Sequence, residues 1–165
     1  MKRLYLLRHA KSSWNDPDLA DFDRPLNERG LVAAPFMGRL IASKNYMPDL
    51  IISSPARRAI ETAELVHESA GPDNAEIKLV ERVYESSPQT LLTIIAALDD
   101  AAGSALLVGH NPGMEGVIRL LTGRSETMPT AALAVIDLNI EHWNDLRSGC
   151  GTLVEVVRPK EHMDN

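Results

Sequence analysis

The amino-acid sequence predicts an α/β protein in which helices cover both faces of a mostly parallel sheet, giving a three-layer α/β/α sandwich. Short apolar runs alternate four times with longer segments whose apolar residues recur at helical spacing, which is typical of strand-then-helix units. Two further apolar runs, residues 131–138 and 151–157, close the chain, and residues 139–149 between them fit a hairpin connection. We therefore expect right-handed crossovers between the parallel strands and a C-terminal antiparallel hairpin that makes one edge mixed.

The first unit begins with the apolar run at residues 4–7, which is short and rich in large side chains, as a buried strand is. A polar loop follows over residues 12–25, and a loop of this length inside a domain is usually functional or mobile. Asn27 is a suitable N-cap for a helix that extends down to Lys44. Pro35 lies inside this helical pattern, and it either kinks the helix or marks its true first turn.

The next units repeat the same order. Strands are expected at residues 50–53, 77–80 and 105–109. The helices after them are expected to open at Ser54-Pro55, at Pro88 and near Pro112, and to run to Gly71, through Leu98 and to Gly123. Pro55 would then occupy a first-turn position, where its missing N–H is not needed.

Length and composition limit the classes of function. The 165 residues fit one domain spanning residues 1–165, with a tail from about residue 159 that we expect to be flexible. The net charge of −6 argues against a nucleic-acid-binding face, although a few converging arginines can still hold a phosphate. Cys150 is the only cysteine, so no oxidising compartment is required. No apolar run is long enough for a signal-peptide core or a membrane span, and we expect a cytoplasmic, monomeric protein without membrane contact.

Basic and imidazole side chains follow three of the predicted strands. Arg8 and His9 come directly after the first strand, Arg58 lies one turn into the helix after the second, and His110 follows the fourth. Because the carboxyl ends of parallel strands face the same side of a sheet, we expect these residues to converge on one pocket. The helices that begin after Ser54 and near Pro112 would also direct their positive N-termini toward it. This combination predicts a site for a phosphoryl group.

The same residues lie in three motifs that resemble those of the histidine phosphatase superfamily, which contains cofactor-dependent phosphoglycerate mutases and acid phosphatases. The motifs are Arg8-His9-Ala10, which is similar to the family's Arg-His-Gly, the segment 53–63 with sequence SSPARRAIETA, and the segment 108–112 with sequence VGHNP. The small size and the segments 8–12, 23–26 and 128–131 look closest to SixA-like phosphohistidine phosphatases. The resemblance covers residues 4 to about 157 and implies a phosphoglycerate mutase-like fold.

The resemblance also implies roles for the residues. His9 would attack phosphorus in line and carry the phosphoryl group as a phosphohistidine, which water then hydrolyses. Arg8, Arg58 and His110 would hold the non-bridging oxygens and stabilise the transition state, so that neither a metal nor a cofactor is expected. Zinc ligation by His9 and His110 lacks a third ligand motif, and the arginines would repel a cation.

The proton donor for the leaving group is the least defined part of the site. By the resemblance, an acidic residue after the third strand has this role in many relatives, and Glu85 is the nearest candidate, with a solvated loop carboxylate as the alternative. An alkoxide leaving group needs such a proton. A phosphohistidine whose other ring nitrogen is protonated departs as neutral imidazole and needs none, because imidazolium has a pKa of about 6.5. An uncertain acid therefore favours N-phosphorylated substrates.

Four further residues are candidates for binding substrate. Lys11 and Ser12 extend the first motif and could donate to the phosphate, although Lys11 could equally lie on the surface. Arg24 could reach in as another phosphate ligand, as similar Arg-Pro-Leu stretches suggest. Asn111 could orient His110 or simply begin a turn.

The function favoured by these observations is a metal-independent phosphatase that acts on protein phosphohistidine, with a histidine-phosphotransfer protein as a possible partner. The alternatives are a phosphomonoesterase for a small phosphate ester and a non-catalytic phosphate-binding scaffold with the same fold. The short chain lacks the large inserted cap with which bigger relatives enclose small molecules, which suits a protein-borne substrate.

Overall fold

A six-stranded sheet forms the centre of the protein, and the computed structural model describes residues 1–71 and 75–163. The strands are β1 (Lys2–Arg8), β2 (Leu50–Ser53), β3 (Ile77–Leu79), β4 (Ser104–Gly109), β5 (Leu133–Leu138) and β6 (Gly151–Val157). Their order in the sheet is β3-β2-β4-β1-β5-β6. Strands β3, β2, β4 and β1 run parallel, whereas β5 is antiparallel to both β1 and β6. The predicted mixed sheet with a C-terminal hairpin is confirmed.

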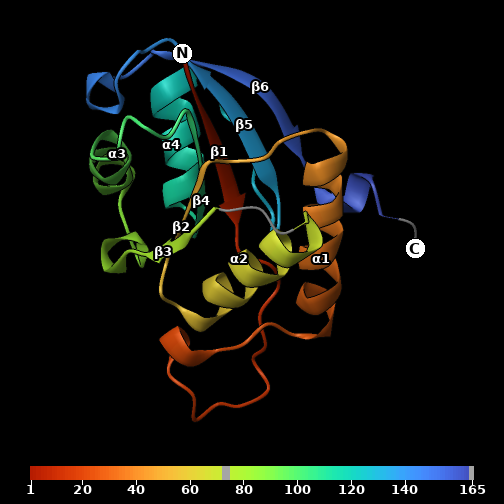
Figure 1. The fold of residues 1–165 in the computed structure, drawn as a ribbon. Helices are drawn as coiled ribbons and strands as arrows, with labels where there is room; N and C mark the ends of the chain where they lie inside the picture. The colour runs from red at the N-terminus through yellow and green to blue at the C-terminus, as the bar shows by residue number, and fades with distance from the viewer. Residues whose placement is uncertain (72–74, 164–165) are drawn as a thin grey trace.

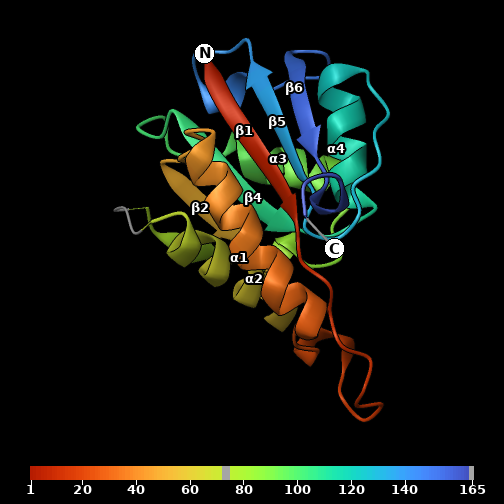
Figure 2. The ribbon, with the colours of Figure 1, turned by 90° about the vertical axis from the view of Figure 1, so that its right-hand side faces the viewer.

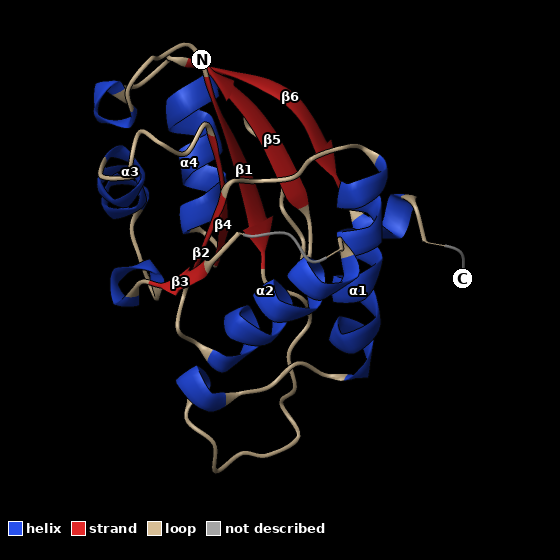
Figure 3. Cartoon of the chain, in the orientation of Figure 1, coloured by secondary structure: helices blue, strands red, loops and turns tan. Residues whose placement is uncertain are grey.

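Helices cover both faces of the sheet, as the alternating pattern predicted (Figures 1 and 3). They are α1 (Glu28–Ser43), α2 (Arg57–Ser69), α3 (Pro88–Ala96) and α4 (Gly113–Thr122), with 3-10 turns at Asp21–Asp23, Glu81–Val83, Trp143–Asp145 and Pro159–Glu161. Figure 2 shows α1 and α2 together on one side of the sheet and α3 and α4 on the other. Pro159, at the start of the predicted tail, is buried.

The core is divided by the sheet into two apolar clusters, because successive strand residues point to opposite faces. In β1, Leu4 and Leu6 pack with α3 and α4, whereas Tyr5 and Leu7 pack with α1 and α2. Strand β4 alternates in the same way. A strand that is buried on both faces reads as a continuous apolar run, which is why β1 and β4 are the clearest strands in the sequence.

Two predictions about prolines are resolved by the structure. Helix α1 begins at Glu28 and is capped by Asn27, whose side chain accepts a hydrogen bond from the backbone of Gly30, so Pro35 lies inside the helix and not in its first turn. The prediction that α2 opens at Ser54-Pro55 is wrong by two residues. The Ser54 hydroxyl accepts a hydrogen bond from the backbone N–H of Ala56, which forms a turn before the helix begins at Arg57.

The sheet order places the carboxyl ends of β1, β4 and β2 side by side. Arg8 pairs with Gly109 and Ser53 pairs with Val108 in the parallel registers. The residues that follow these pairs therefore leave the sheet at one edge, where the loop over residues 12–25 extends beyond the strands (Figure 1). Among the described residues, no helix has the length and apolar character needed to cross a bilayer.

Candidate active site

His9 and His110 follow directly on the last paired residues of β1 and β4, and their ring centroids lie 5.1 Å apart. The backbone N–H of His9 continues the ladder by donating to the carbonyl oxygen of Gly109 at 3.0 Å. The convergence of these histidines, which the sequence predicted from strand ends alone, therefore results from the register of two neighbouring parallel strands.

The tautomer of His9 is set by its own backbone. Its Nδ1 lies 2.7 Å from the carbonyl oxygen of Ala10. Because a carbonyl oxygen can only accept, Nδ1 carries the hydrogen and Nε2 holds the lone pair of the neutral ring. Burial lowers the pKa of His9 to about 3; the hydrogen bond to Ala10 opposes this shift, and the charges of Arg58 and Arg8 add to it. The ring is therefore neutral at pH 7, with Nε2 available as a nucleophile.

Arg8 is held by one terminal nitrogen. Its NH1 donates to the carbonyl oxygen of Met128 at 3.0 Å. Asn111 donates to the same oxygen at 2.8 Å, and Glu115 accepts from the backbone N–H of Met128 at 2.8 Å, so the Met128 peptide is fixed from two sides. Burial lowers the pKa of Arg8. An arginine pKa remains far above neutrality under such a shift, and the guanidinium stays charged.

Arg58 is presented by the first turn of α2. Its NH1 donates to the carbonyl oxygen of Asp21 at 2.7 Å, and its NH2 donates to Oδ2 of Asp21 at 3.0 Å. Thr62 joins this helix to the segment after His9, because its hydroxyl donates to the carbonyl oxygen of Arg58 at 2.7 Å and accepts from the backbone N–H of Ala10 at 2.9 Å. Thr62 is fully buried, so this connection is shielded from solvent.

His110 is oriented by a hydroxyl and an aromatic ring. Its Nε2 lies 2.8 Å from the hydroxyl oxygen of Ser54, and Tyr84 packs edge-on against it at a centroid distance of 5.6 Å. Burial lowers the pKa of His110 to about 4, with Arg58 acting in the same direction. His110 is therefore neutral at pH 7.

Unpaired polar nitrogens mark the centre of the site. Among the described residues, the buried side-chain nitrogen and oxygen atoms that lack a hydrogen-bond partner are Arg8 Nε, Arg58 Nε and His110 Nδ1. A buried polar group without a partner costs free energy, and such atoms gather where a ligand supplies the missing partner. All three belong to the residues that the sequence predicted as phosphate ligands, and two of them are donors on cations. They fit a tetrahedral oxyanion.

The other predicted substrate-binding residues lie around this centre with different surroundings. Lys11 is exposed, whereas Ser12 is buried and its hydroxyl accepts from NH1 of Arg24 at 2.7 Å. The same guanidinium donates through Nε and NH2 to Oδ1 of Asp21. Asn111 uses its amide on Met128 and Glu115 and makes no hydrogen bond to His110.

Glu85, the candidate proton donor, is exposed. Within the described part of the chain its carboxylate makes no hydrogen bond, and its backbone has a φ of 55°. Its neighbour Tyr84 reaches the site instead and donates to Oδ2 of Asp21 at 2.6 Å. Burial and this hydrogen bond raise the pKa of Tyr84 to about 12.

Asp21 and Tyr84 are site residues that the sequence analysis missed. Asp21 accepts hydrogen bonds from Arg24, Arg58 and Tyr84. The hydrogen bond from Tyr84 and those from the two arginines lower its pKa, against an opposing effect of desolvation, so the carboxylate is ionised at neutral pH. The run Asp21-Phe22-Asp23 before Arg24 was visible as acidic loop sequence, but no spacing rule connects a loop carboxylate to a helix arginine.

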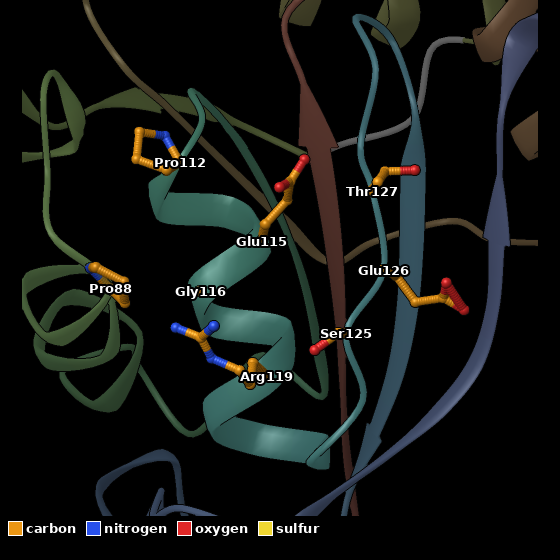
Figure 4. Close-up of a pocket in the computed structure, with 8 residues that line it drawn as sticks. All are labelled: Pro88, Pro112, Glu115, Gly116, Arg119, Ser125, Glu126 and Thr127. Carbon is orange, nitrogen blue, oxygen red and sulfur yellow. The ribbon is translucent and has the colours of Figure 1, made fainter.

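A groove is lined by residues of α4, by Pro88 and by residues 125–127. Figure 4 shows it between α4 and residues 125–127, with the side chains of Glu115 and Arg119 on the helix and Pro88 across from them. None of the four central residues lines it. In the described residues, no group of three or more His, Cys, Asp or Glu side chains is arranged to hold a metal ion.

The fold is that of a three-layer α/β protein in which two arginines and two histidines gather at the carboxyl ends of the parallel strands. The sequence model of the histidine phosphatase superfamily (branch 1) matches residues 4–91. The chain belongs to this superfamily.

Two relatives match over most of their length. An uncharacterized protein of Mycobacterium tuberculosis is 33% identical over 165 aligned positions, which cover 93% of this chain and all of the relative. A protein of Agrobacterium tumefaciens described as a SixA-type phosphohistidine phosphatase is 34% identical, with a TM-score of 0.82 and coverage of 96% and 98% of the two chains.

The structure of the protein histidine phosphatase SixA in complex with tungstate has a TM-score of 0.83 at 20% identity, covering 98% of this chain and 99% of that one, and supports the fold. The chain is thus SixA-like within its superfamily, and the family and the neighbouring structures support phosphatase activity.

Proposed function

We propose that this protein is a metal-independent phosphatase that removes phosphoryl groups from protein phosphohistidine through a phosphohistidine intermediate at His9. The observation that carries the proposal is the set of unpaired nitrogens of Arg8, Arg58 and His110 beside a neutral imidazole. These groups would bind the non-bridging oxygens and stabilise the negative charge of the transition state.

In the first step, Nε2 of His9 forms a bond to phosphorus while the bond from phosphorus to the substrate nitrogen breaks. The electron pair of the broken bond goes to the departing imidazole, which leaves as a neutral ring because its other nitrogen already carries a proton. The His9 ring becomes cationic, with its Nδ1–H still donating to the carbonyl oxygen of Ala10. In the second step, water attacks phosphorus and the bond to Nε2 breaks. Both protons of the water leave on the phosphate, and His9 returns to its neutral form.

We propose a phosphorus–nitrogen bond as the bond that is cleaved because of the protonation states of the groups near the site. Asp21 is ionised, and the hydroxyl hydrogen of Tyr84 is committed to it. His110 is neutral, and Glu85 is exposed. An imidazole leaving group needs no proton, whereas an alkoxide does. Glu85 remains the candidate donor for ester substrates, which the site is expected to turn over slowly.

The proposed substrate is a phosphorylated histidine-phosphotransfer protein. Trp14, Leu19 and Phe22 are exposed on the loop that extends beyond the sheet, and Phe22 packs edge-on against Tyr84 of the site. Apolar side chains at the entrance of a site suit a protein surface better than a small sugar phosphate. We also propose that the protein acts as a monomer in the cytoplasm.

The test is hydrolysis by the purified protein in the presence of a metal chelator. A radiolabelled, phosphorylated histidine-phosphotransfer domain, a phosphoramidate and a panel of sugar phosphates are compared. We expect the phosphoprotein to be hydrolysed fastest and the protein to acquire an acid-labile, alkali-stable label.

The variants His9→Ala and His142→Ala provide the matched pair. His142 is exposed and its Nδ1 lies 3.1 Å from Oδ2 of Asp100, outside the site. The His142→Ala variant should therefore acquire the phosphoryl label like the wild type. Label that persists in His9→Ala contradicts the assigned nucleophile. Preference for a sugar phosphate supports a phosphomonoesterase, and a Glu85→Gln variant that loses only the ester activity would identify its proton donor. Phosphate binding without any turnover supports a scaffold.

A further inference from the structure

Asp21 accepts hydrogen bonds from Arg58 through two different oxygens. Its backbone carbonyl accepts from NH1 at 2.7 Å, and its carboxylate accepts from NH2 at 3.0 Å. The Arg58 side chain is only 7% exposed, whereas that of Asp21 is 43% exposed. Both terminal nitrogens of the buried arginine are therefore fixed from the solvent side, by a residue that carries no part of the proposed chemistry.

Asp21 is itself fixed by neighbours on separate segments. Its Oδ1 accepts from Nε and NH2 of Arg24, at 3.2 and 2.9 Å, and its Oδ2 accepts from the hydroxyl of Tyr84 at 2.6 Å. Arg24 is anchored in turn, because its NH1 donates to the hydroxyl of Ser12 at 2.7 Å. The carboxylate thus joins the loop after β1, the segment after β3 and the first turn of α2.

The backbone that carries Asp21 is also held in place. The 3-10 turn at Asp21–Asp23 is closed by hydrogen bonds from Asp23 to Ala20 and from Arg24 to the Asp21 carbonyl oxygen. Farther along, the backbone N–H of Leu26 donates to Glu61 of α2 at 2.8 Å. The turn that carries Asp21 is therefore attached to α2, which is also the helix that carries Arg58.

The hydrogen bonds to Asp21 leave Nε of Arg58 without a partner. A guanidinium has five N–H groups, and Asp21 uses one on each terminal nitrogen. The Nε–H is buried and unpaired, and the Arg58 charge acts on both His9 and His110. Nε is therefore the Arg58 donor that still lacks a partner, and it belongs to a residue whose charge acts on both histidines of the proposed phosphoryl site.

We propose that Asp21 is a positioning residue, which holds Arg58 in the rotamer that presents Nε to the phosphoryl group. This inference rests on the proposed function, because the phosphoryl group is the ligand that Arg58 is positioned to meet. Arg24 and Tyr84 act through Asp21 and not on the phosphate. Arg8, Arg24 and Arg58 with one ionised Asp21 leave a local charge of +2, which matches a phosphoryl dianion.

The alternative role for Asp21 is that of a competitor, which occupies Arg58 in place of the phosphate. A carboxylate that only mimics the phosphate would compete with it, and its removal would strengthen anion binding. The two roles therefore predict opposite signs for one measurement. The carbonyl contact, the folded turn and the free Nε of Arg58 favour positioning, because a competitor would have to leave before the anion enters.

The test measures tungstate binding by isothermal titration calorimetry in the wild type and in Asp21→Ala, with Asp23→Ala as the matched control. Asp23 is an exposed aspartate in the same turn, and its side chain makes no hydrogen bond within the described residues. We expect Asp21→Ala to weaken tungstate binding about tenfold, as the loss of one charge-assisted contact would, and Asp23→Ala to change it less than about twofold. Thermal unfolding checks that both variants fold.

A double-mutant cycle separates positioning from a general structural effect. If Asp21 acts through Arg58, then adding Asp21→Ala to an Arg58→Ala variant costs no further affinity. Tyr84→Phe, which removes only the hydroxyl donor, should weaken tungstate binding by about threefold. In steady-state kinetics with a substrate that the protein hydrolyses, Asp21→Ala should lower kcat as well as raise KM, since Arg58 would contact the transition state.

Unchanged or tighter tungstate binding in Asp21→Ala contradicts the positioning role, and so does full additivity with Arg58→Ala. These outcomes are distinct from failure of the proposed function. A wild-type protein that binds tungstate but hydrolyses no phosphohistidine would overturn the function alone, whereas the affinity comparison would still decide the role of Asp21.

Discussion

Arg8 and Gly109 face each other across β1 and β4, and this pairing places the rings of His9 and His110 5.1 Å apart. Burial lowers the pKa of both rings, and the charges of Arg58 and Arg8 act in the same direction. Both imidazoles are therefore neutral at pH 7, and this has consequences for pH dependence, for stability and for the effects of single substitutions.

The first prediction concerns stability against pH. The pKa of His9 falls from 6.5 in the unfolded chain to about 3 in the folded protein, so between these values the unfolded chain binds a proton that the folded one does not. The stability that depends on neutral His9 is thus fully present above pH 6.5 and is lost as pH falls toward 3. We expect the Tm to decrease from pH 7 to pH 5 more steeply in the wild type than in His9→Ala. Equal slopes in the two proteins would contradict a depressed pKa.

The second prediction concerns the hydroxyl beside His110. Ser54→Ala removes the contact of Ser54 with Nε2 of His110 and leaves the ring free to reorient. We expect kcat to fall about fivefold, which corresponds to about 1 kcal/mol for one neutral hydrogen bond. His110→Ala should cost more, about 100-fold or above, because it removes a proposed donor to the transition state. Steady-state kinetics on phosphohistidine would show which variant loses more kcat. Equal decreases in kcat for Ser54→Ala and His110→Ala would contradict the orienting role of Ser54.

The third prediction concerns Thr62, which links the segment after His9 to the helix that carries Arg58. Thr62→Val keeps the shape but leaves the N–H of Ala10 buried without its acceptor. We expect a loss of about 1–3 kcal/mol in the free energy of unfolding, together with a lower kcat. Thr93→Val is the matched control, because its hydroxyl donates to a helix carbonyl on the exposed surface. Urea denaturation of the pair measures the difference, and similar losses in both would argue against a special role for Thr62.

The fourth prediction concerns a close backbone contact. Gly30 lies in α1, and a Cβ at this position would come within 2.2 Å of the carbonyl oxygen of Lys11. Gly30→Ala must therefore displace either the helix or the segment that follows His9, at a cost of about 1–3 kcal/mol. Gly103→Ala, whose nearest contact would be 3.4 Å from Asp49, serves as the control. Unfolding curves with tungstate present and absent would show whether the site moves as well.

Much of the fold was predictable because its signals are local. β1 and β4 are buried on both faces, so their sequences are continuous apolar runs, and Asn27 and Gly123 mark helix ends through their own capping geometry. Pro55 was misplaced because proline is equally compatible with the first turn of a helix and with the turn before it. The hydroxyl of Ser54, which accepts from the backbone N–H of Ala56, stabilises the turn before the helix.

The residues of the site also fall into two groups, those with a local sequence signal and those placed by tertiary packing alone. Arg8 ends β1, His9 and His110 follow β1 and β4, and Arg58 lies in the first turn of the helix after β2, so the strand order brings their side chains together. Asp21 lies in a loop without periodicity, and its contacts with Arg58 and Tyr84 depend on how that loop packs against α2 and the segment after β3. Contacts of this kind depend on tertiary structure and leave no spacing signal in the sequence.

Strand β1 is hydrogen-bonded along both of its edges, to β4 and to β5, and His9 stands one residue beyond its end. Backbone amides in such a strand exchange with solvent only when the whole domain opens. The anchor of the proposed nucleophile thus belongs to the slowest-exchanging part of the molecule, and the contacts of Asp21 and Arg24 tie the loop over residues 12–25 to the same site.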